Sequence, residues 1–202
     1  MYSSGVLITA ILLLFTSVVS AQEIDASHRN WKVTVQKVLE KSAEGFVNVI
    51  TPIEQVDWQF RPKGYRHSVG EVAEHTALSH QGLQRLVNRA ISSPSKPEIA
   101  DALLKKYDVI RRFMVDTPLR PENFSAKNTL RTKAEVIEYF QMAHKKAVNI
   151  LNTTSSRILS QHVHKHPRPL YGDLTALQWM YYLGAHTQRH VGQIQRMIEQ
   201  LP

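Results

Sequence analysis

Two histidines four residues apart near the C-terminal end of the chain could bind a metal ion. The stretch GAHTQRHVGQ, residues 184–193, carries His186 and His190. On an α-helix this spacing places both side chains on one face, one turn apart. With 10 histidines in 202 residues, however, about 0.5 such pairs are expected by chance. A metal site therefore requires that the pair face the protein interior and that a third ligand come from elsewhere.

The helical pattern around the pair indicates that both imidazoles face inward. At 100° per residue His190 falls within the apolar arc of this segment and His186 lies at its edge. The apolar residues of the arc are Trp179, Met180, Leu183, Val191, Ile194, Met197 and Ile198. An imidazole inside a helical bundle needs either a metal or hydrogen-bond partners for its nitrogens. The alternative is that each is a half-buried core histidine bonded to a carbonyl or a carboxylate.

A third ligand could come from a second amphipathic segment. In residues 68–91 His75 lies at one margin of the apolar stripe, and His80 lies about 140° away, at the other margin. Only one of these two histidines can face the helix that carries His186 and His190, and the helical pattern does not show which one does. Three histidines from two helices would leave a coordination position open, as catalytic zinc sites do.

Helical periodicity accounts for most of the chain, and almost no segment alternates with period two. Capping boxes mark three helix starts: Ser68-Val-Gly-Glu71, Thr132-Lys-Ala-Glu135 and Thr175-Ala-Leu-Gln178. We expect helices over about 27–50, 68–91, 98–115, 132–152 and 175–200, separated by proline-containing loops. This pattern predicts an all-α, up-down four-helix bundle in which 98–115 is an additional helix.

The N-terminal segment predicts export. Residues 6–19 form an uncharged apolar run too short to span a bilayer comfortably, followed by the small residues that a signal peptidase prefers around Ala21. We therefore predict a signal peptide over 1–21, cleaved near Ala21, and one helical domain over 22–202. The product would be periplasmic or extracellular, with no stable membrane span after cleavage. An uncleaved N-terminal anchor is the alternative.

The amino-acid composition excludes several kinds of site. The chain has no cysteine, which excludes disulfides, thiolate ligands and cysteine nucleophiles. Its net charge of +8 comes from scattered residues without a dense basic run, so we expect no nucleic-acid partner. A second histidine concentration, His162, His164 and His166, could gather a metal at the surface, but a solvated basic loop is the simpler interpretation. Similarly, Glu71 fits its capping box and Glu74 falls on a polar helix face, so neither receives a catalytic role.

Three segments together resemble the DinB/YfiT-like superfamily of metalloenzymes. They are VDWQFRPKGYRHSVGEVAEHTA, TKAEVIEYFQMAHKKAVNIL and LYGDLTALQWMYYLGAHTQRHVGQIQRM, and the resemblance runs from about Trp31 to Ile198. It implies a four-helix bundle that binds a divalent metal through one histidine of its second helix and the His-x-x-x-His of its last. Position by position, these ligands are His75, His186 and His190, which favours His75 over His80.

The resemblance also suggests a function. Some relatives use the metal to activate a low-molecular-weight thiol, although export would remove this chain from the cytosolic thiol pool. We therefore predict an exported metal-dependent hydrolase or transferase acting on an unidentified small molecule. A non-catalytic metal- or ligand-binding bundle is the alternative. The metal would be zinc or nickel, with iron or manganese as further candidates. Bundles of this kind often form homodimers, but no feature of the sequence specifies one.

Overall fold

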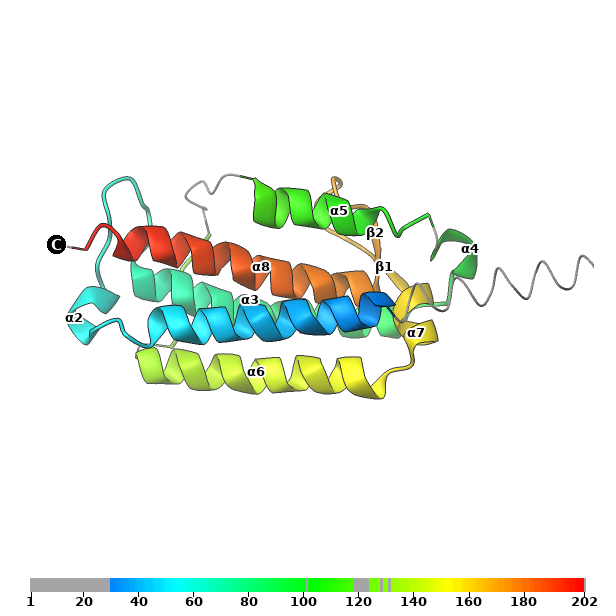
Figure 1. The fold of residues 1–202 in the computed structure, drawn as a ribbon, viewed down its shortest axis with the longest axis horizontal. Helices are drawn as coiled ribbons and strands as arrows, with labels where there is room; N and C mark the ends of the chain where they lie inside the picture. The colour runs from blue at the N-terminus through cyan, green and yellow to red at the C-terminus, as the bar shows by residue number, and fades with distance from the viewer. Residues whose placement is uncertain (1–29, 101, 118–123, 128, 131, 202) are drawn as a thin grey trace, which may run out of the picture.

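Four long helices form the body of the protein. The computed structural model describes residues 30–201 except 101, 118–123, 128 and 131, so the predicted signal peptide lies outside the described residues. The four are an N-terminal helix over 30–50, α3 (Val69–Ile91), α6 (Lys133–Thr153) and α8 (Ala176–Ile198). They lie side by side with similar axes (Figure 1). The all-α bundle predicted from the sequence is confirmed.

The three predicted capping boxes each begin a long helix. The side chains of Ser68, Thr132 and Thr175 accept hydrogen bonds from backbone N–H groups three residues later. The Glu or Gln side chain at that later position accepts from the N-cap backbone in return. Because these pairs satisfy donors that a helix start leaves free, they fix where α3, α6 and α8 begin.

The long helices run in two directions. Gly45 packs beside Val191 and Gly184 beside Val38, so the N-terminal helix and α8 run parallel. In contrast, His80 bonds Thr187 while His75 lies beside His190, so α3 and α8 run antiparallel. The segment between α3 and α6 returns along the bundle beside α8, and successive elements therefore alternate in direction (Figure 1).

This returning segment is not the single helix expected over 98–115. It comprises α4 (Pro97–Ala100), a turn, α5 (Lys106–Arg111) and a π-helical turn, η1 (Arg112–Asp116). In a continuous helix the Leu103 carbonyl would accept from Tyr107, but here it accepts from the Lys106 N–H and from the Gln178 side chain of α8. The turn that results still lets Leu103 and Tyr107 both reach the core.

Short elements close the two ends of the bundle. At one end α2 (Gln55–Trp58) precedes α3, and its Trp58 packs where a Gly70 side chain would be. At the other end are α7 (Ser156–Gln161) and a two-stranded hairpin, β1 (Val163–Lys165) and β2 (Asp173–Thr175). None of these short elements was predicted.

The hairpin corrects the prediction of a solvated loop at residues 162–166. His166 is buried, and its ring stacks on Trp179 at 4.8 Å. His166 directly follows β1, and its backbone N–H donates a hydrogen bond to the Gly172 carbonyl at 2.8 Å, so closure of the hairpin holds its ring against Trp179. The structure does not group His162, His164 and His166 as ligands among the residues that it describes.

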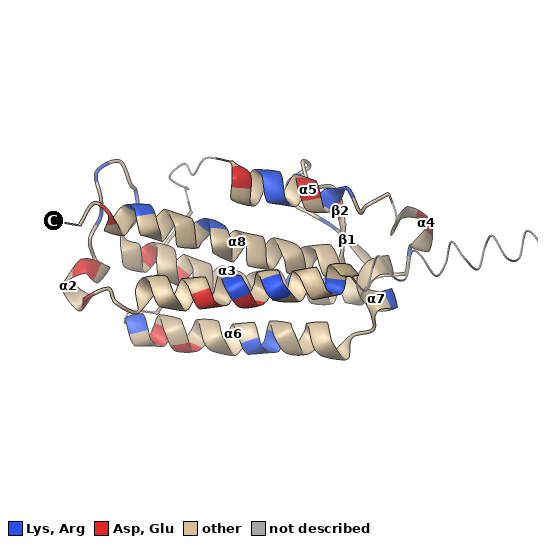
Figure 2. Ribbon diagram, viewed as in Figure 1, with Lys and Arg blue, Asp and Glu red and all other residues tan. Residues whose placement is uncertain are grey.

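Positively and negatively charged residues are mixed along the helices. Along the N-terminal helix and α6, Lys and Arg are interspersed with Asp and Glu (Figure 2). Within the described part of the chain, no helix combines the length and apolar character needed to cross a membrane.

Candidate metal centre

The fold brings His75, His186 and His190 together. His75 projects from the N-terminal third of α3, and the other two lie one turn apart on the antiparallel α8. Each residue offers one nitrogen, and the three nitrogens lie within 4.8 Å of one another. The Nε2 atoms of His186 and His190 are 3.3 Å apart. Tetrahedral zinc with metal–nitrogen bonds of about 2.0–2.1 Å requires ligand separations of about 3.3–3.5 Å, so small ring movements suffice.

Neighbouring polar groups orient two of the rings. The Nδ1 atom of His190 lies 2.9 Å from Oε1 of Gln193, an amide oxygen that can only accept a hydrogen bond. His190 therefore carries its proton on Nδ1, and its Nε2 lone pair faces His186. The Nε2 atom of His75 lies 3.4 Å from the Ser79 hydroxyl. Such partners fix the tautomer and orientation of metal-binding histidines.

The environment keeps the cluster in the form that metals bind. Burial is the main cause that lowers the pKa of His186 well below its ordinary value, and the nearby His190 and His75 lower it further. A neutral imidazole retains the lone pair that a metal requires. The donor set, its convergence and its protonation state thus fit a divalent ion.

His80 lies outside this cluster, facing a different part of the bundle. Its Nδ1 atom is 3.2 Å from the Thr187 hydroxyl, and its ring packs near Phe140 and His144 of α6. Burial lowers the pKa of His80 to about 3. His75, rather than His80, is thus the α3 histidine that approaches His186 and His190.

One loop covers the exposed side of His75. The ring of Phe124 stacks on His75 at 4.0 Å and on His67 at 3.8 Å. Glu74 holds this loop, because one of its carboxylate oxygens accepts from the backbone N–H of Thr129 and Leu130 and from the Thr129 hydroxyl. Glu74 is only 2% exposed, so its position on the polar face of the helix does not bring it into contact with solvent.

A cavity of about 320 Å³ reaches His75 beside this loop. Its walls include Phe124 and Ser79, and the cations Arg85 and Lys127 line it as well. Gly82 also borders the cavity, and a methyl group at this glycine would meet no atom within 4 Å. The open space next to a candidate ligand is large enough for a small molecule.

Comparison with protein families supplies the identity of the fold. Residues 38–194 match the DinB superfamily, a span that contains all three clustered histidines. The chain belongs to the DinB superfamily. Comparisons with curated proteins and with solved structures each returned no match. The family therefore supports the three-histidine cluster as compatible with metal binding, while the reaction must be argued from the site itself.

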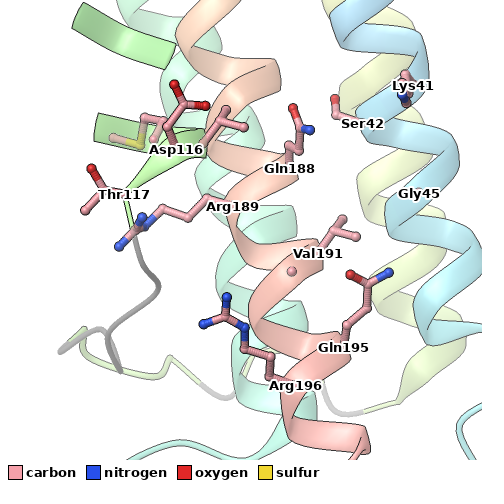
Figure 3. Close-up of a pocket in the computed structure, with 13 residues that line it drawn as sticks. Lys41, Ser42, Gly45, Asp116, Thr117, Gln188, Arg189, Val191, Gln195 and Arg196 are labelled. Atoms are coloured by element: carbon pink, nitrogen blue, oxygen red, sulfur yellow. The ribbon is translucent and has the colours of Figure 1, made fainter. Parts of the chain in front are cut away.

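A larger cavity, of about 580 Å³, lies on another face of α8 in this DinB-family bundle. It is bordered by the N-terminal helix, η1 and α8, and Arg189 and Arg196 extend to the same side of it (Figure 3). No histidine lines the described part of this cavity, although Lys41 adds a third cation. Since size alone does not provide metal ligands, the smaller cavity at His75 is the better candidate for chemistry.

The residues that support the cluster were not predicted from the sequence. Gln193 follows His190 by three positions, a spacing that places both on one helix face and could have indicated the contact. Phe124 and the Glu74 loop had no comparable signal, because their contacts join segments about 50 residues apart.

Proposed function

We propose that this DinB-family protein is an exported metal-dependent hydrolase or transferase. His75, His186 and His190 would hold one divalent ion. The observation that carries the proposal is the cavity at His75, since a small molecule in it would lie next to the cluster. A purely structural metal site has no need of such a space, because it uses all its coordination positions for protein ligands.

An ion bound by three imidazoles would act as a Lewis acid, polarising a substrate oxygen or lowering the pKa of a bound water or thiol. Zinc or nickel suits this neutral nitrogen donor set best, with iron or manganese as further candidates. Around the ion, Gln193 would keep the His190 proton on Nδ1 and the Nε2 lone pair directed at the cluster.

The remaining residues would bind and orient the substrate. Phe124 stacks on His75 and excludes water from one side of the ring. Arg85 and Lys127 give the cavity a positive rim that favours a polar or anionic substrate. The buried Glu74 carboxylate is engaged with the loop at 129–130, which argues against its use as a general base.

Metal analysis of protein without a histidine tag tests the site. The variant His186→Ala/His190→Ala should bind one equivalent of Zn²⁺ less than wild type while keeping its helical circular-dichroism spectrum. Equal metal content in the two proteins would refute the site. A screen of ester, amide and phosphate substrates, and of thiol transfer, should then find an activity that this double variant lacks.

The second candidate is a non-catalytic metal- or ligand-binding protein. The stacking of Phe124 on His75 favours it, because the ring restricts access to one side of the cluster. Stoichiometric metal without activity across the screen would support this alternative. Fractionation of cells that express the full chain would test export and cleavage near Ala21.

A further inference from the structure

Two buried imidazole nitrogens lie near each other away from the three-histidine cluster. They are Nε2 of His80, on α3, and Nδ1 of His144, on α6, and neither has a hydrogen-bond partner. The two ring centroids are 5.7 Å apart and the ring planes are inclined by 55°. Buried polar atoms are nearly always satisfied, so two unsatisfied nitrogens on adjacent rings require a physical explanation.

The hydrogen bonds of Thr187 determine the tautomer of His80. The Thr187 hydroxyl donates its one hydrogen to the Leu183 carbonyl at 3.1 Å. Its oxygen must therefore accept from the Nδ1–H of His80 at 3.2 Å. It follows that Nε2 of His80 carries a lone pair and no hydrogen. With the residue only 1% exposed, this lone pair points into the bundle without a donor.

The carboxylate of Glu40, on a third helix, acts on His144 electrostatically. Burial lowers the pKa of the half-buried His144, and the charge of Glu40 on the N-terminal helix acts in the opposite direction. Glu40 is exposed, and one of its carboxylate oxygens accepts from the Gln36 side chain at 2.8 Å. Its carboxylate can exchange this exposed hydrogen bond for another partner at little cost.

We propose that His80 and His144 bind a second transition-metal ion, and that the exposed Glu40 side chain turns toward them to supply a carboxylate ligand, because among the described residues its oxygens do not already converge with the two rings. Two imidazoles that share one ion have ring centroids roughly 5–6.5 Å apart, given metal–nitrogen bonds of about 2.0–2.1 Å. The observed 5.7 Å lies in this range and equals the separation of the His75 and His186 rings. The second site is independent of the function proposed for the first.

The chemistry of this site selects the class of ion. Two neutral imidazoles and one carboxylate suit a borderline divalent ion such as Zn²⁺ or Co²⁺. The negative charge of Glu40 compensates part of the charge that enters the bundle, which two imidazoles alone would not do. Since His144 is half-buried and Glu40 is exposed, the ion can reach the pair from the surface between the N-terminal helix and α6.

Metal titration of the full-length protein tests the second site. Metal is removed with dipicolinate, and the protein is reloaded with Zn²⁺ or, for its visible absorption bands, Co²⁺. Wild type should bind about two equivalents. The variants His144→Phe and His186→Ala/His190→Ala should each lose a different one, and their combination should bind none. The His186→Ala/His190→Ala variant should retain only the Co²⁺ bands of the second site. His144→Phe should lack those bands.

Two further variants complete the experiment. Glu40→Gln should weaken the second site at least about tenfold without affecting the first, as expected when a ligand charge is removed. His164→Gln removes an imidazole outside both clusters and should leave both equivalents. If the His186→Ala/His190→Ala variant is folded and binds no Co²⁺ or Zn²⁺, the proposal is wrong. In that case Nε2 of His80 and Nδ1 of His144 are hydrogen-bonded to each other or to a buried water.

Discussion

The Nδ1 atom of His190 donates a hydrogen bond to Oε1 of Gln193, 2.9 Å away and three residues further along α8. Both side chains are buried, so water does not compete for this bond. The contact makes Gln193 a positioning residue for the metal centre, since it leaves the Nε2 lone pair of His190 directed at His186.

Replacing Gln193 should therefore weaken metal binding. Gln193→Leu removes the acceptor and frees the His190 ring to rotate or change tautomer, and we expect a loss of about 10–100-fold in Zn²⁺ affinity. Competition with a chromogenic chelator measures this change. Gln195→Leu is a matched control, because Gln195 is an exposed glutamine of the same helix. Equal affinities for the two variants would contradict the role of Gln193.

Gly82 controls the space beside His75. A Cβ atom at this position would meet no atom within 4 Å, and because Gly82 lines the cavity, a larger side chain there would occupy part of it. Gly82→Phe should therefore leave metal stoichiometry unchanged but slow the removal of Co²⁺ by dipicolinate. Gly82→Ala should stabilise α3 by about 1 kcal/mol without closing the cavity. Faster or unchanged metal removal in Gly82→Phe would show that ligands reach the cluster by another route.

The bundle and its three histidines could be predicted because their signals are local. The capping boxes at Ser68, Thr132 and Thr175 depend on residues three positions apart, and the inward orientation of His186 and His190 depends on helical periodicity. The choice of His75 over His80 came from the family resemblance. Helix periodicity alone could not make it, because both histidines lie at margins of the apolar stripe.

The parts that could not be predicted depend on contacts between distant segments. The break before α5 forms where Gln178 binds the Leu103 carbonyl, and Glu74 is buried by a loop about 55 residues further along the chain. His166 is another example, since its burial depends on a hairpin partner and on Trp179. No local pattern of residue types encodes such pairings, so tertiary contacts overrode the local signal.

Glu74 should contribute to stability through the loop that it holds. Glu74→Gln replaces the shared acceptor of two N–H groups and one hydroxyl by a weaker, uncharged one. We expect the free energy of unfolding to fall by about 2–3 kcal/mol, because hydrogen bonds to a buried charge are strong. Urea denaturation measures the loss, and hydrogen exchange at residues 124–130 should become faster. The exposed Glu138→Gln should change stability by less than about 0.5 kcal/mol; a similar loss in both variants would refute a specific role for Glu74.

His166 should make the protein less stable as the solution becomes acidic. Burial, its largest influence, lowers the pKa of His166 from 6.5 to about 4, and its Nδ1 accepts a hydrogen bond from the Arg168 N–H at 2.9 Å. Below about pH 6.5 the unfolded chain binds a proton that folded His166 does not, so stability falls until about pH 4. Across this pH range, protonation of this histidine lowers the free energy of unfolding by about 3 kcal/mol.

His166→Phe should keep the stacking on Trp179 and remove this pH dependence. Urea denaturation at about pH 7 and about pH 5 should therefore show a smaller loss of stability for His166→Phe than for wild type. Part of the acid sensitivity should remain in the variant, because burial also lowers the pKa of His80 and His186. His164→Gln, two residues earlier on β1 and less buried, serves as the control. Parallel pH profiles for wild type and His166→Phe would mean that His166 is protonated without unfolding, through opening of the hairpin.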